Sequence, residues 1–116
     1  MMAGSTDPTG PIREKAASFL EVDRGISCNQ NSFKVGKGSF LFIGRVRKGT
    51  GFRAMFKLEH SMPQARKLAS KEFHRFKVGS TGWVTTRFTT EKPLPKSIWA
   101  KWLHESYDIC CGKGNK

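Results

Sequence analysis

The stretch SFKVGKGSFLFIGRVRKGTGFRAMFKL, residues 32–58, decides the fold, because its apolar residues recur with the two-residue period of β-strands. At its start, Phe33 and Val35 alternate with Lys34, which predicts a half-buried strand. A turn follows at 36–38 (GKG), where glycine supplies the backbone conformations that tight turns require. The beginning of the stretch therefore predicts a β-hairpin.

Two further strands are predicted in the rest of this stretch. Residues 39–46 (SFLFIGRV) form a nearly continuous apolar run, which favours a central strand covered on both faces. After a second turn at 48–51 (KGTG), residues 52–58 (FRAMFKL) alternate again. In this last strand the apolar side chains face one way, and Arg53 and Lys57 face the other. Three consecutive strands joined by short turns indicate an antiparallel meander.

Apolar residues at helical spacing lie on both sides of the predicted sheet. Before it, residues 11–22 (PIREKAASFLEV) predict a helix of about three turns that ends near Asp23 and Gly25. Its apolar stripe consists of Ile12, Ala16, Phe19 and Leu20. After the sheet, residues 61–73 predict a second helix with Ser61 as a candidate cap. A last helix follows the PLPK segment, and its broad apolar face consists of Ile98, Trp99, Trp102, Leu103 and Tyr107.

One more strand is predicted at 83–89 (WVTTRFT), which is rich in β-branched and aromatic residues. The element order α–β–β–β–α–β–α predicts an α+β domain, with an antiparallel meander packed against N- and C-terminal helices. We expect a single domain over residues 11–111, because the chain is long enough for one core. Residues 1–10 are expected to be a flexible leader and 112–116 a flexible tail.

The composition limits the class of protein. The 116 residues include 21 Lys and Arg against 9 Asp and Glu, a formal net charge of +12. Such an excess attracts polyanions, of which nucleic acid and anionic membrane surfaces are the common ones. No stretch approaches the roughly 18–20 apolar residues of a membrane span, and the N-terminal residues lack the apolar core of a secretory signal. We therefore predict a cytoplasmic protein.

The cysteines and histidines predict neither a metal site nor a cofactor. Cys28, Cys110 and Cys111 are odd in number, which argues against a disulfide framework and favours a reducing compartment. No cysteine pair has the CxxC spacing of a metal ligand set, and the three histidines pair with no cysteine at such spacing. The alternative is a redox-sensitive Cys110–Cys111 pair, which would require activation of a thiol by nearby Lys113.

The basic residues are concentrated in one part of the chain. From Arg24 to Leu58 there are eight Lys and Arg and no Asp or Glu. A basic β-ribbon can lie against a phosphate backbone, and an aromatic ring beside an arginine can stack on an exposed base. We therefore predict a nucleic-acid-binding module, with DNA as the expected partner. The candidate binding residues are Lys34, Lys37, Arg45, Arg47, Lys48, Arg53, Lys57, Trp83 and Arg87.

Other interpretations of these residues stay open. Trp83 could pack under a helix, since most tryptophans are largely buried, and the basic side chains could simply solvate a sheet. A module that meets an acidic protein or a small ligand is the main functional alternative. A membrane-surface role ranks last, because the basic residues lie on predicted strands rather than on an amphipathic helix. A monomer is favoured.

We predict that the chain is not an enzyme and has no catalytic residues. It contains no glycine-rich phosphate loop and no paired carboxylates in a common predicted cleft. The segments 59–61 (EHS) and 104–106 (HES) each place an acid, an imidazole and a hydroxyl side by side. Adjacent residues, however, do not share a face in the way that a catalytic triad needs.

Four motifs follow one another along the chain: SFKVGKGSF at 32–40, GWV at 82–84, PLP at 93–95 and IWAKWLHESY at 98–107. In order and spacing they resemble the MmcQ/YjbR-like family of small bacterial proteins, over about residues 11–110. The resemblance implies a frataxin-like (CyaY-like) α+β fold of the double-wing type, DNA binding and no catalytic residues. The positions that match the family are Lys34, Lys37, Trp83 and Tyr107.

The resemblance does not extend to iron binding. Frataxin binds iron through an acidic ridge that includes its first helix. The corresponding segment here has only Glu14, Glu21 and Asp23, and the chain as a whole is basic. A shared fold would not by itself settle the function.

Overall fold

A computed structural model describes residues 8–19, 22–27, 30–36, 38–46, 51–79 and 81–111, the side chains of 26, 27, 30 and 111 excepted. The elements are α1 (Gly10–Ser18), β1 (Asp23–Ser27), β2 (Gln30–Val35), β3 (Gly38–Arg45), β4 (Phe52–Lys57), α2 (Met62–Lys71), β5 (Phe76–Val78), β6 (Trp83–Phe88) and α3 (Lys96–Cys111). The predicted α+β class, with an antiparallel sheet packed against N- and C-terminal helices, is confirmed.

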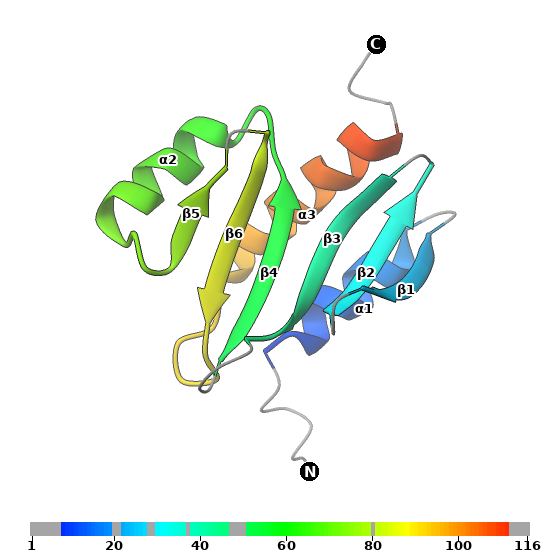
Figure 1. The fold of residues 1–116 in the computed structure, drawn as a ribbon, viewed down its shortest axis with the longest axis horizontal. Helices are drawn as coiled ribbons and strands as arrows, with labels where there is room; N and C mark the ends of the chain where they lie inside the picture. Colours follow the sequence, from blue (N-terminus) through cyan, green and yellow to red (C-terminus); the bar gives the residue numbers. More distant parts are fainter. Residues whose placement is uncertain are drawn as a thin grey trace.

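The strands form one six-stranded antiparallel sheet in the order β1-β2-β3-β4-β6-β5. Helices α1 and α3 lie behind this sheet in Figure 1, whereas α2 lies beside the edge strand β5. In this view no described helix crosses the front of the sheet. The sheet therefore has one face covered by α1 and α3 and one face that these helices leave open.

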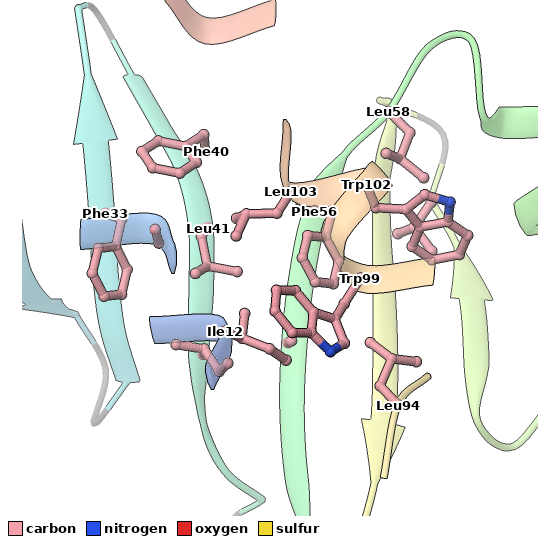
Figure 2. Close-up of a cluster of buried hydrophobic side chains, with 14 of the residues drawn as sticks. Ile12, Phe33, Phe40, Leu41, Phe56, Leu58, Leu94, Trp99, Trp102 and Leu103 are labelled. Atoms are coloured by element: carbon pink, nitrogen blue, oxygen red, sulfur yellow. The ribbon is translucent and has the colours of Figure 1, made fainter. Parts of the chain in front are cut away.

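The core lies between the sheet and the two helices behind it. Trp99, Trp102 and Leu103 of α3 are buried. In Figure 2, Leu103 lies beside Leu41 and Trp99 lies beside Phe56, whereas the Trp102 ring extends away from Leu41 toward β6. α1 contributes two buried residues of its predicted stripe, Ile12 and Ala16. Burial of these side chains is the main favourable term in folding, so the helix face of the sheet is the structural face.

A β-bulge explains the continuous apolar run in β3. Phe33 is paired with Leu41, but the next residue, Lys34, is paired with Ser39, so Phe40 is an extra residue in β3. Phe40 and Leu41 are consecutive and both fully buried. The prediction of a strand covered on both faces is therefore wrong. The bulge puts the neighbours Phe40 and Leu41 in one core, and of the apolar residues 40–43 only Phe42 points to the other face.

A buried serine of α3 completes the hydrogen bonding at the bulge. The hydroxyl of Ser106 donates to the carbonyl oxygen of Phe40 at 2.6 Å and accepts from the backbone N–H of Lys57 at 2.9 Å. The pairing of β3 with β4 ends at Leu41 and Phe56, one residue before these two groups. A buried backbone group without a partner is costly, so Ser106 replaces the missing ladder bond. Its role is structural.

The two edges of the sheet were not predicted as strands. β1 occupies residues where the helix was expected to end, and α1 stops earlier, at Ser18. Phe19 is already extended, with φ −70° and ψ 158°, and its ring lies 4.5 Å from that of Tyr107. β5 has only three residues. Short edge strands are stabilised by their neighbours rather than by their own pattern, which is why the sequence does not reveal them.

The N-terminus of α2 is held by a carboxylate of α3. Oε2 of Glu105 accepts hydrogen bonds from the backbone N–H groups of Glu59, at 2.6 Å, and Ser61, at 3.0 Å. The hydroxyl of Ser61 donates to Oε1 of Glu105 at 2.6 Å and makes no capping bond within its own helix. Ser61 does precede α2 as predicted, but Glu105 supplies the acceptor that a capping serine would have supplied.

Glu105 should make the stability of the fold sensitive to acid. Partial burial raises the pKa of Glu105, but hydrogen bonds from Ser61 and from the backbone at 59–61 outweigh it and hold the pKa below its ordinary value. The pKa of Glu105 is thus lower in the folded protein than in the unfolded chain. The carboxylate stabilises the fold fully above the pKa that it has in the unfolded chain, and this stabilisation is lost as the pH falls through the lower pKa of the folded protein. We expect Glu105→Gln to cost about 1 kcal/mol at neutral pH, and much less below about pH 4.

Urea unfolding of the wild type and of Glu105→Gln, from neutral pH to below about pH 4, measures the difference in their free energies of unfolding. Glu59→Gln is the control, because Glu59 contributes only its backbone N–H to this contact. A difference between wild type and Glu105→Gln that stays constant with pH would contradict the assignment.

Candidate nucleic-acid interface

The sheet face opposite α1 and α3, which we call the open face, is defined by the alternation of side chains along each strand. In β4, the residues Phe52, Ala54 and Phe56 are buried on the helix side, so the residues between them point the other way. Strand pairing extends this assignment across the sheet. The open face consists of Asp23, Gly25, Ser32, Lys34, Ser39, Phe42, Gly44, Arg53, Met55, Lys57, Lys77, Trp83, Thr85 and Arg87.

Positive charge dominates the open face. Its five basic residues are Lys34, Arg53, Lys57, Lys77 and Arg87, and its one acidic residue is Asp23 at the β1 edge. A sheet face on which nearly all charges have the same sign raises the local concentration of oppositely charged ligands.

Two arginines of the open face are direct cross-strand neighbours. Arg53 of β4 is paired with Arg87 of β6, and Gly44 is paired with Arg53 on the β3 side. Like charges directly opposite one another destabilise a sheet, and Gly44 adds no side chain at the paired position of β3. The pair therefore suits an anion that approaches from outside the sheet and interacts with both guanidinium groups.

An aromatic pair lies between the basic positions. The rings of Phe42 and Trp83 have their centroids 5.5 Å apart and their planes inclined by 51°. They come from β3 and β6, so the contact crosses the intervening strand β4 near Met55. All three side chains are half-buried. The interpretation that Trp83 packs under a helix is therefore wrong, because it lies on the open face.

The predicted site residues do not all share this face. Lys34, Arg53, Lys57, Trp83 and Arg87 are brought together on it. Arg45 is not, because it is paired with Phe52 on the helix side, where its guanidinium carbon lies 5.3 Å from the Phe52 ring. The remaining candidates, Lys37, Arg47 and Lys48, lie outside the described residues.

Three features of the open face were missed in the sequence. Phe42 was hidden in the apolar run because the bulge at Phe40 could not be foreseen. Lys77 alternates with buried Phe76 in β5, a signal too short to predict a strand. A hollow beside Phe42 is lined by residues of β1, which the sequence did not predict as a strand. All three depend on pairing between strands.

The other chemical groups singled out in the sequence have structural contacts. The segments 59–61 and 104–106 meet, but Glu105 binds Ser61 and the intervening backbone. Nδ1 of His104 lies 3.3 Å from Oδ2 of Asp108. Within the described part of the chain, no group of three or more His, Cys, Asp and Glu is placed to hold a metal ion. The half-buried thiol of Cys110 donates to the carbonyl oxygen of Ser39 at 3.3 Å, whereas Cys28 and the Cys111 side chain lie outside the described residues.

Comparisons of the chain with protein-family models, with curated proteins and with solved structures find no match. The resemblance to the MmcQ/YjbR-like family therefore stays a prediction, and so do the CyaY-like and double-wing descriptions of the fold. None of the helices in the described residues is long and apolar enough to cross a membrane. The function has to be argued from the open face itself.

Proposed function

We propose that the protein is a small, non-enzymatic nucleic-acid-binding module that holds a phosphate backbone against its open face. The observation that carries the proposal is the set of five basic side chains on one sheet face, including the Arg53–Arg87 pair. DNA is the expected nucleic acid, as the family resemblance implies. Arg and Lys side chains bind phosphate oxygens well, and such contacts supply most of the affinity of proteins that bind nucleic acids without sequence preference.

The spacing of the charges supports a polyanion rather than a single small anion. Arg53 and Lys57 lie four residues apart on β4, which corresponds to about 13 Å along the strand. Lys77 is paired with Thr85 at the β5 edge, and Lys34 is paired with Asp23 at the opposite edge. The charges thus extend over most of the sheet. A chain of phosphates can contact several of them at once.

Salt dependence of binding tests this proposal. If all five basic residues of the open face contact phosphates, the logarithm of the association constant should fall with the logarithm of salt concentration with a slope of about −3.5 for a single strand and −4.5 for a duplex. Between about 50 and 300 mM salt the affinity should then fall by about 500-fold for a single strand and about 3,000-fold for a duplex. Fluorescence anisotropy of labelled oligonucleotides measures both quantities.

Two results would decide against the proposal. The absence of binding to either oligonucleotide at low salt would exclude the nucleic-acid role and favour an acidic protein or a small ligand as the partner. Binding whose affinity does not change with salt would show that phosphate contacts do not provide the affinity.

A further inference from the structure

A hollow lies on the open face directly beside the aromatic pair. It measures about 480 Å³, within the range of small-molecule sites, and lies over β1, β2 and β3. Its lining consists of Asp23, Arg24, Gly25, Ser32, Lys34, Ser39 and Phe42. Phe42 therefore belongs both to the wall of the hollow and to the contact with Trp83.

The lining has the chemistry that recognises a flat, polar ring. The aromatic wall offers a stacking surface, and the small residues Gly25, Ser32 and Ser39 leave room beside it. The serine hydroxyls can donate and accept hydrogen bonds, and Lys34 can only donate. A carboxylate at Asp23 disfavours phosphate but accepts hydrogen bonds from an exocyclic amino group of a base. The hollow thus combines an aromatic wall and small hydroxyl residues with two basic side chains, Arg24 and Lys34, and one carboxylate.

From this arrangement we propose that the open face binds single-stranded nucleic acid, with bases stacked on Phe42 and Trp83 and one unstacked base in the hollow beside Phe42. This inference rests on the proposed function, because the basic side chains hold the backbone while the bases turn toward the sheet. Arg53 and Arg87 lie at one end of the aromatic pair, and Lys34 and Lys57 lie at the other end. A duplex keeps its bases paired and stacked inside, so it cannot use the rings or the hollow.

Three ligands separate base recognition from charge. They are an oligonucleotide of about 12 nucleotides, within the usual range of single-strand site sizes, its duplex, and an abasic strand of the same length. We expect the single strand to bind the intact protein at least about 10-fold more tightly than the abasic strand, since stacking contributes on the order of 10-fold per base. Stacking should also quench tryptophan emission. Trp99 and Trp102 are buried, with exposed fractions of 7% and 0%, so the quenching reports Trp83.

Two substitutions test the two parts of the surface separately. Trp83→Leu removes the ring and should weaken single-strand binding by about 10- to 100-fold without changing the affinity for the abasic strand. Gly25→Val should narrow the hollow beside Phe42 and weaken single-strand binding alone. The added Cβ atom would lie 3.4 Å from Oγ of Ser32, an ordinary contact, so the strand is expected to remain intact.

Phe73→Leu is the matched control for loss of an aromatic ring. Phe73 is 80% exposed and is not part of the open face, so its replacement should leave all three affinities unchanged. Circular dichroism confirms that each variant is folded. Two results would overturn this inference and leave the proposed function intact. One is equal affinity for the single strand, the duplex and the abasic strand. The other is wild-type affinity of both Trp83→Leu and Gly25→Val for the single strand. No binding to any of the three ligands would instead refute the proposed function.

Discussion

Replacing Arg53, Lys57 and Arg87 together by glutamate should weaken nucleic-acid binding by on the order of 100-fold or more. The three side chains lie on adjacent strands of the open face, with Arg53 paired to Arg87 and Lys57 paired to Trp83. Each exchange removes a phosphate contact and adds a charge that repels phosphate. The dependence on salt should also weaken, by about 0.7 in slope for each lost contact with a single strand.

The fold should tolerate this triple exchange. Arg53 and Arg87 are already like charges at paired positions of adjacent strands, and the two glutamates would reproduce that repulsion rather than create it. None of the three side chains belongs to the buried core. The unfolding midpoint in urea should therefore shift only slightly, and a large shift would require a different explanation of any lost binding.

A control with the same change in net charge separates the site from the overall charge. Lys15, Lys96 and Lys101 are exposed on α1 and α3, on the helix side of the molecule. Their replacement by glutamate lowers the formal net charge from +12 to +6, as the open-face exchange does, because three charges reverse in each case. We expect at most a several-fold loss of affinity. Equal losses in the two variants would contradict the open face as the binding surface.

Trp102→Ala should destabilise the fold by about 3–5 kcal/mol, which is a large part of the 5–15 kcal/mol that holds a typical domain together. Trp102 is fully buried and is among the largest such side chains in the core. Its ring lies 6.0 Å from the rings of both Phe56 and Phe76, in edge-to-face contact. Its Nε1 atom donates a hydrogen bond to Oε1 of Gln64 at 3.1 Å.

These contacts connect four elements through one side chain. Trp102 belongs to α3 and contacts β4, β5 and α2, so its removal also loosens the edge of the sheet that carries Lys77. Urea unfolding followed by circular dichroism measures the loss. Trp83→Leu serves as the comparison, because it removes an indole ring from the open face instead of from the core. This substitution should lower the free energy of unfolding far less. A loss below about 1 kcal/mol for Trp102→Ala would show that this core position collapses around the cavity.

The helix-facing residues of the sheet could be predicted well from the sequence. The period of two places Phe33, Ala54 and Phe56 on one face, and all are buried as expected. The same period places Lys34, Arg53 and Lys57 on the other face, where the structure has them. This success is physical in origin, because alternation is a property of each strand and does not depend on which strand lies beside it.

The sequence could not predict the features that arise from contacts between strands. The bulge at Phe40 is visible only in the pairing of β2 with β3, and the pairing of Phe42 with Met55 shows that Phe42 faces away from the core. β1 and β5 are strands only because β2 and β6 offer them free edges. Likewise, the role of Glu105 at the start of α2 depends on how α3 packs against the segment before that helix.

By itself the sequence determined the class of fold, the excess of positive charge and the face on which most strand residues lie. Each of these follows from local spacing or from composition. Only the tertiary structure decided that Arg53 lies opposite Arg87, that Trp83 reaches Phe42 across β4, and that a hollow lies beside them. Those proximities depend on the order in which distant segments pair, and that order is settled by the packing of the whole core rather than by any single segment.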